Sequence, residues 1–211
     1  MGTVQVSQGD QITIGDRQVV LDVSEVAPVG AGGDGLPLVR SVAFPMLNIK
    51  EAWYEYAYFK GSYVGHPPAR DWNLESLGNT DLGEPLGAPF VGIVTAAGQM
   101  GGSVGRAVQI MGITTNGRIV VWVGWHLHEV DVMVNDIVAL GEQIGSIGNA
   151  DGRYAGAHLH EQICFLKGSG LPSPTTFATD WRYDWIDCLE FYRQMGIPEA
   201  EIERVAGFNQ E

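Results

Sequence analysis

Residues 106–127, RAVQIMGITTNGRIVVWVGWHL, hold two apolar runs separated by a polar turn at Asn116-Gly117. Short apolar runs bounded by Gly, Asn or Asp are typical of β-strands. The same pattern of short apolar runs recurs in the segments PFVGIVTAAG (89–98), DIVALGEQIGSIGN (136–149) and AHLHEQICFL (157–166). We therefore predict a mainly β chain whose body is an antiparallel β-sheet.

The two ends of the chain differ from this body. Short alternating bursts between residues 3 and 27 predict further strands, and the glycine-rich loop 28–37 follows them. In the tail, Trp181, Trp185, Leu189 and Tyr192 recur at helical spacing, with Gly196 as a stop. We expect a helix there and a second short helix from Pro198 to about Gly207. These patterns divide the chain into a strand-rich appendage, a main domain and a helical extension packed on it: 1–45, 46–170 and 171–211.

One further segment, AWYEYAYF at 52–59, predicts a strand that places its three tyrosines on one face. Those rings could pack into a core or line a binding groove, and the sequence leaves both open.

Composition narrows the range of partners. The 211 residues include 12 Lys and Arg against 25 Asp and Glu, a formal net charge of −13. This balance argues against nucleic acid or an anionic membrane surface as a partner, because both require clustered basic residues. No stretch approaches the eighteen apolar residues of a membrane span, and MGTVQVSQGDQITIGDR at the start predicts no secretory signal.

Histidines carry the strongest chemical signal. Four of the five lie in two His-Leu-His triplets, at 126–128 and 158–160. On a strand, His158 and His160 would share one face while Leu159 points into the core. That arrangement suits a metal ligand beside a catalytic partner, although a surface strand could carry the same pair without function.

The segment GHPPARDWN offers a second candidate. Catalytic zinc sites commonly use three imidazole or carboxylate ligands and leave a fourth position for water. His66 and Asp71 could supply two of these ligands. Alternatively, Asp71 only caps the turn that follows the two prolines.

The first His-Leu-His triplet ends an apolar run, which favours His126 over His128 as a functional residue. The two would share a face if the strand continued through them. Glu129 and Asp131 could then fix the tautomer of an imidazole by hydrogen bonding.

The chain resembles the lysostaphin-type, or LytM-type, zinc metallopeptidases, which are also called glycyl-glycine endopeptidases. The resemblance lies in the order of four motifs: the His/Asp segment, the strand ending in Trp-His-Leu, the hairpin VNDIVALGEQIGSIGN and the final AHLHE. The resemblance covers about residues 60–165. It implies a barrel-sandwich hybrid fold and an enzyme in which a zinc-activated water hydrolyses peptide bonds of peptidoglycan cross-bridges or stem peptides.

The resemblance also implies roles for particular residues. Zinc would be held by His66, Asp71 and His160, while His126 and His158 would be catalytic residues that do not bind the metal. In the family these two act on the water and on the developing oxyanion.

Two departures from the family pattern stand out. One extra residue separates His66 from Asp71, which leaves Glu75 and Asp81 as alternative carboxylates. Glu161-Gln162 replaces the usual aromatic residue after the last triplet, which we interpret as a change in packing rather than a loss of the site.

The sequence also admits other functions. A non-catalytic LytM-type domain could bind wall peptide or a partner protein. A lipoyl or biotin carrier has a similar hairpin but needs an acceptor lysine, and none occurs between residues 61 and 166. A cell-wall hydrolase that acts outside the cell without a signal peptide must leave by another route, by lysis or within a particle. A phage lysin, or a virion or phage tail component, therefore enters as a further expectation.

Cysteines leave two questions open. Cys164 and Cys188 could form a disulfide or stay free. Cys164 follows the last triplet by four residues, and we expect a buried, small apolar side chain there rather than a metal ligand.

Overall fold

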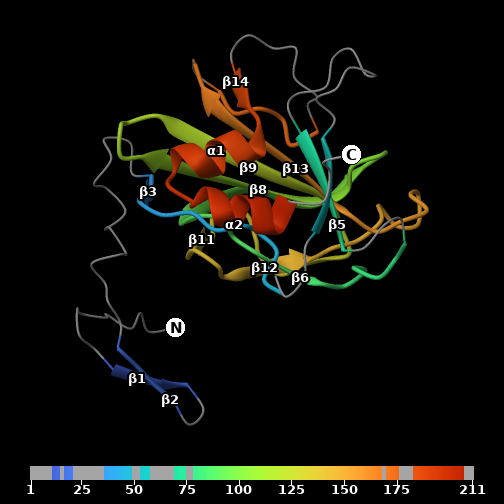
Figure 1. The fold of residues 1–211 in the computed structure, drawn as a ribbon, viewed down its shortest axis with the longest axis horizontal. Coiled ribbons are helices and arrows are strands. Elements are labelled where there is room, and N and C mark those ends of the chain that lie inside the picture. The colour runs from blue at the N-terminus through green and yellow to red at the C-terminus, as the bar shows by residue number, and fades with distance from the viewer. Residues whose placement is uncertain are drawn as a thin grey trace.

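The computed structural model describes residues 11–14, 17–20, 36–48, 53–57, 69–74, 78–167, 170–175 and 183–206. Within these residues, one large β-sheet dominates (Figure 1). Seven of its strands lie side by side in the order β11 (Ile137–Val138), β7 (Gly92–Gly101), β8 (Gly105–Thr114), β9 (Ile119–Leu127), β13 (Leu159–Leu166), β5 (Ala69–Leu74) and β4 (Trp53–Ala57). All neighbours in this row are antiparallel. The predicted mainly β, antiparallel body is confirmed.

Two short strands extend the sheet, and two smaller sheets accompany it. In the large sheet, β3 (Leu38–Val39) pairs in parallel with β8, and β14 (Tyr183–Ile186) pairs antiparallel with β13. A second sheet has the order β10 (Glu129–Val130), β12 (Gln143–Ser146) and β6 (Pro85–Gly87). The third is the hairpin of β1 (Gln11–Ile14) and β2 (Arg17–Val20), in the segment where the sequence predicts short strands.

Strand β9 lies at the centre of the fold because both of its faces are covered. All of its residues after Ile119 are buried. Val120 and Trp122 belong to the main hydrophobic core, whereas Val121 and Val123 belong to a smaller apolar cluster. A strand buried on both faces reads as a continuous apolar run, which is why this stretch has no polar alternation.

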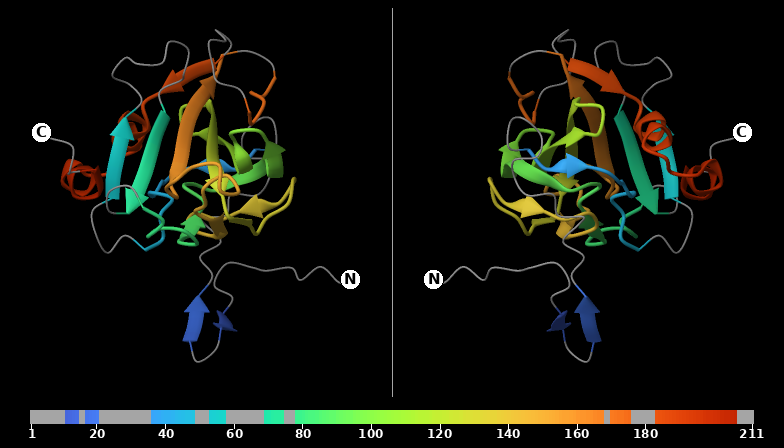
Figure 2. Two further views of the ribbon diagram at one scale, coloured as in Figure 1. Left: turned by 90° about the vertical axis from the view of Figure 1, so that its right-hand side faces the viewer. Right: turned by 90° about the vertical axis from the view of Figure 1, so that its left-hand side faces the viewer.

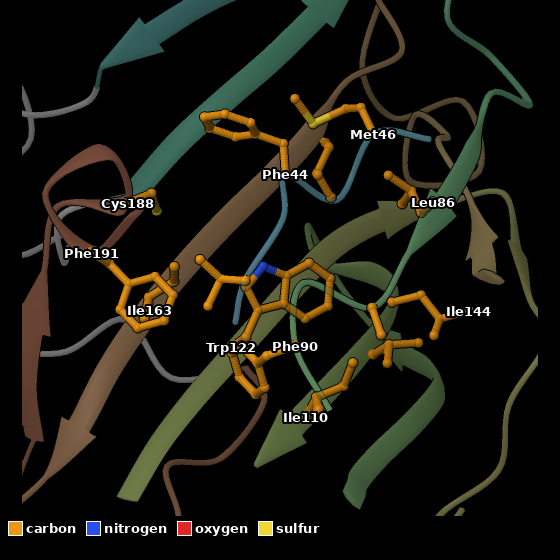
Figure 3. Close-up of a cluster of buried hydrophobic side chains, with 14 of the residues drawn as sticks. Phe44, Met46, Leu86, Phe90, Ile110, Trp122, Ile144, Ile163, Cys188 and Phe191 are labelled. Carbon is orange, nitrogen blue, oxygen red and sulfur yellow. The ribbon is translucent and has the colours of Figure 1, made fainter. Parts of the chain in front are cut away.

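The two helices cover the main core. Figure 2 shows α1 (Cys188–Gln194) and α2 (Glu199–Ala206) on one side of the sheet. Figure 3 shows Phe191 of α1 near Ile163 of β13, and both belong to the same buried cluster as Trp122. Ile202 and Val205 of α2 are buried in that cluster too. The helices therefore complete the main core, behind the strands of the large sheet.

The predicted first helix begins later than its periodicity indicates. Trp185 lies in β14, opposite Cys164 of β13, rather than in a helix. The helix starts only at Cys188, where the Asp187 side chain accepts a hydrogen bond from the backbone N–H of Glu190. Pairing with the free edge of β13 prevails over the local helical pattern. Trp181 lies outside the described residues.

Gly196 ends the first helix as predicted, with φ at +93°, and the second helix also forms. The segment 36–48, part of which we expected in the appendage, packs on the body: Val39, Val42, Phe44 and Met46 are buried in the main core. The predicted strand at 52–59 is β4, but the orientation of its tyrosines lies outside the described part of the structure. In the described ranges, no helix is long and apolar enough to cross a membrane.

Candidate functional site

Asp71 and His160 meet on neighbouring strands. The register of β5 and β13 places them directly opposite each other. Nδ1 of His160 lies 2.9 Å from Oδ1 of Asp71, and the two side chains are only 6% and 10% exposed. On its other side His160 is paired with Trp125 of β9, whose ring stacks on the imidazole at 4.4 Å between centroids and an interplanar angle of 11°. The sheet therefore fixes this imidazole between a carboxylate and an indole.

His158 reaches the same carboxylate from one end of the strand. Its Nε2 lies 3.9 Å from Oδ2 of Asp71. Its Nδ1 lies 3.1 Å from the carbonyl oxygen of Gly156, which fits an N–H donor there. Leu159, between the two histidines, is fully buried in the main core. The alternation expected for this triplet thus places both imidazoles on the Asp71 side of the sheet.

His126 joins the group through a β-bulge. Between β8 and β9, Arg106 pairs with Leu127 and Ala107 with Trp125, so that His126 is an extra residue opposite the partner strand. Its φ of +67° is rare for a residue with a side chain. Leu127 packs in the main core, whereas Trp125 lies in the smaller cluster. The bulge therefore interrupts the alternation and turns His126 towards the face that holds His160.

The ring of His126 lies 4.6 Å from that of His158 and 5.7 Å from that of His160, between centroids. Its Nδ1 is 3.1 Å from the carbonyl oxygen of Val104. Burial, together with the nearby His158 and His160, lowers the pKa of His126 from 6.5 to about 3. His126 is therefore neutral at neutral pH, with Nδ1–H donating to Val104 and Nε2 left as an acceptor.

The first triplet does not meet the condition for a shared face, which is a strand that continues through His126 and His128. The strand ends at Leu127, so His126 and His128 do not share a face, and His128 is exposed. Glu129 is exposed as well, and Asp131 accepts a hydrogen bond from Gln143 rather than from an imidazole. A backbone carbonyl orients His126 instead.

Tyr154 is a member of the site that the sequence analysis missed. Its ring lies 4.6 Å from the ring of His126 and 5.2 Å from that of His158. Its hydroxyl donates to the carbonyl oxygen of Ser103 at 3.2 Å. An ion pair of 2.6 Å between Arg106 and Asp151 holds the same loop against β8. Its nearness to His158 in the sequence did not by itself indicate a contact with either histidine.

The other predicted residues lie in different places. His66 and the alternative carboxylate Glu75 lie outside the described residues. Asp81 is buried in the loop before β6, while Asp71 supplies the carboxylate next to His160. In the part of the chain that is described, no group of three or more His, Cys, Asp or Glu side chains could hold a metal ion. Two of the three expected ligands are therefore placed together, and the third is not described.

Both cysteines are free and buried. Cys164 belongs to the smaller cluster, and burial raises the pKa of its thiol to about 12. Cys188 lies in the main core on the opposite side of β13. The sheet between them explains why they do not pair.

Comparison with protein families gives a match for one part of the chain. Residues 78–170 match the model of peptidase family M23. None of the curated proteins matches the sequence.

Two solved structures of lysostaphin share the fold. The antimicrobial peptidase lysostaphin from Staphylococcus simulans is 22% identical, with a TM-score of 0.53, and the match covers 81% of this chain and 60% of that one. A solution structure of lysostaphin is 20% identical, with a TM-score of 0.51, and covers 81% and 61% of the two chains. The chain thus spans about 60% of the lysostaphin chain that it matches. Residues 78–170 thus match peptidase family M23, and the chain shares the fold of lysostaphin, in agreement with the lysostaphin-type or LytM-type family that the sequence motifs predict.

Proposed function

We propose that this chain is a zinc-dependent endopeptidase that hydrolyses peptide bonds in peptidoglycan cross-bridges or stem peptides. The observation that carries the proposal is the convergence of four side chains from three strands and one loop. Asp71 and His160 are in hydrogen-bond contact, and the rings of His158 and His126 lie beside them. The family of residues 78–170 supports peptidase chemistry at this position.

The two described ligand candidates fit zinc. Zinc in catalytic sites binds carboxylate oxygen and neutral imidazole nitrogen, and Asp71 and His160 present these two atoms 2.9 Å apart in a buried setting. We propose His66 as the third ligand, as the resemblance implies. When bound, zinc supplies positive charge that polarises a carbonyl and acidifies a water molecule.

The two histidines that do not bind metal would act on the attacking water and on the developing oxyanion. Nε2 of His126 is left as an acceptor because Nδ1 faces the Val104 carbonyl oxygen. We assign it the removal of a proton from the attacking water. His158 lies next to the Asp71 carboxylate, and we assign it the stabilisation of the developing oxyanion. The Tyr154 ring packs on both imidazoles and limits their rotation.

The experiment that tests this function has two steps. Metal content is measured on the purified protein, which is then incubated with purified bacterial peptidoglycan, with and without a chelator. Mass spectrometry of the released peptides identifies the bond. Stoichiometric zinc and chelator-sensitive cleavage would support the proposal. Tight wall binding without turnover would instead favour a non-catalytic LytM-type domain.

The setting in which the enzyme acts is a further part of the proposal. We propose action on the cell wall from outside the cell, either from a virion, where phage tail proteins would be its partners, or after lysis. Detection of the protein in purified phage particles would support this, and detection only in the envelope of uninfected cells would contradict it.

The domain division is proposed with one change. We extend the peptidase domain to residues 36–170 and retain 171–211 as the helical extension. The burial of Val39, Val42 and Phe44 in the main core supports moving the end of the N-terminal appendage to a point before residue 36.

A further inference from the structure

Glu161, directly after His160, is a fully buried carboxylate in the main core. Its Oε2 accepts a hydrogen bond from Nε1 of Trp72 at 2.8 Å. Its Oε1 accepts one from Nε1 of Trp122 at 2.7 Å and one from the hydroxyl of Tyr192 at 2.6 Å. The proposed mechanism makes no use of this group, although its burial is costly.

Glu161 accepts all three of these hydrogen bonds, and two of them come from indole N–H groups, which can only donate. A buried polar group must be hydrogen-bonded to offset the cost of its burial. Each of the three donors therefore offsets part of the cost of burying the Glu161 side chain.

The position of this cluster ties it to the candidate site. Trp72 follows Asp71 on β5, and Glu161 follows His160 on β13, so their side chains meet on the opposite face of the same two strands. The Asp71–His160 contact and the Trp72–Glu161 hydrogen bond thus lie back to back across the sheet. A sideways or twisting movement of β5 against β13 would break both together.

Strand β9, the third strand that contributes to the site, is linked to Glu161 through Trp122. A Cβ atom on Gly124 would lie 2.4 Å from Cη2 of the Trp122 ring, so the indole lies over this glycine and reaches Glu161. Trp122 and Gly124 belong to β9, which also carries Trp125 and His126. One carboxylate therefore links the strands that supply Asp71, His126 and His160, and Tyr192 links it to α1.

We propose that Glu161 is a positioning residue, whose carboxylate holds β5, β9 and β13 in the alignment that brings Asp71 and His160 together for metal binding. The inference rests on the proposed function for its consequence and on the described contacts for its geometry. It assigns separate tasks to the donors: Trp72 acts on the ligand pair, and Tyr192 anchors the helix.

Glu161→Gln and Tyr192→Phe form the matched pair for a test. A glutamine side chain has one acceptor oxygen; if this faces Trp122 and Tyr192, its NH₂ group points at the N–H of Trp72. We expect Glu161→Gln to weaken Zn²⁺ binding, measured by calorimetry on the full chain, by about tenfold, the lower end for groups that orient metal ligands. Tyr192→Phe should lower the melting temperature but change Zn²⁺ affinity less than about twofold, because β5 and β9 keep their donors.

A third variant tests the geometry through rescue. Trp72→Phe removes the N–H that would oppose the glutamine amide, so the double variant Glu161→Gln/Trp72→Phe should bind Zn²⁺ more tightly than the two single losses together predict. A readout without metal accompanies it. In the chelated protein, the ¹⁵N signal of His160 Nδ1 should shift in Glu161→Gln and stay unchanged in Tyr192→Phe.

The outcomes separate this inference from the proposed function. If the unmodified chain binds no zinc and cleaves no peptidoglycan, the proposed function fails, while the His160 signal still tests the positioning role. If the unmodified chain binds zinc but Glu161→Gln leaves both the affinity and the His160 signal unchanged, the positioning role is wrong. Equal effects of Glu161→Gln and Tyr192→Phe on Zn²⁺ affinity would also overturn it.

Discussion

Gly148 sets how closely His126 and His158 approach each other. Its carbonyl oxygen accepts the backbone N–H of His158 at 3.0 Å. On its other side, an added Cβ would lie 2.3 Å from the carbonyl oxygen of His126 and 2.5 Å from the backbone nitrogen of His128. These atoms belong to the backbone, so no side-chain rotation can relieve the overlap. The φ of Gly148 is not positive, which makes the penalty of Gly148→Ala steric.

The size of the effect follows from the overlap. A Cβ needs at least 3.0 Å, so the end of β9 must move by about 0.7 Å relative to the segment before His158. Overpacking of this kind costs about 1–3 kcal/mol, which for a chain of this size is a fall in Tm of roughly 2–12 °C. Because the two imidazoles are 4.6 Å apart between centroids, we also expect the cleavage rate to fall by about 100-fold, as for other displacements near 1 Å.

Thermal unfolding followed by circular dichroism measures the first effect, and the rate of peptidoglycan digestion at saturating zinc measures the second. Gly78→Ala is the control, because the nearest atom to its added Cβ, the nitrogen of Thr80, is 3.9 Å away. We expect the control to lie within about 0.5 kcal/mol of the unmodified protein. A Gly148→Ala variant with unchanged Tm and rate would refute the reasoning.

The remaining predictions concern the histidines and the first helix. His160→Ala should abolish zinc binding and activity; His158→Ala should keep zinc but lower turnover by about 100-fold or more, and a near-normal rate for the second variant would show that its assigned role is wrong. Because φ at His126 is +67°, His126→Gly should be more stable to urea than His126→Ala by about 1 kcal/mol, and equal midpoints would contradict the strain. Asp187 caps α1 and lies 2.6 Å from Arg70, so Asp187→Ala should be about 1 kcal/mol less stable than Asp187→Asn, which retains the cap; urea unfolding that shows no difference would argue against the cap.

Local patterns predicted the elements that depend on local physics. The apolar runs gave β7, β8, β9 and β13, because a strand buried on one or both faces must carry apolar residues at short intervals. Gly196 marked the end of α1 and Pro198 the start of α2 for the same kind of reason. The helical spacing around Trp185 failed because an unpaired edge of β13, distant in sequence, offered backbone hydrogen bonds to that segment.

In the candidate site, too, local patterns predicted some features, and contacts between distant segments decided the others. The order of the His and Asp motifs was enough to predict the family, and the alternation in His158-Leu159-His160 was enough to place two imidazoles on one face. The bulge that turns His126 and the contact of Tyr154 with two histidines were not visible in the sequence, since each depends on how one strand or loop meets another.

By itself, the sequence determined the class of fold, the family and the residue types available for chemistry, because hydrophobic periodicity and motif spacing are properties of neighbouring residues. Only the tertiary structure decided which of these residues meet. Strand register places Asp71 opposite His160, and the same register places Trp72 beside Glu161 on the reverse face. Register is set by core packing and by hydrogen bonds between segments about ninety residues apart, and no local pattern encodes contacts at that separation.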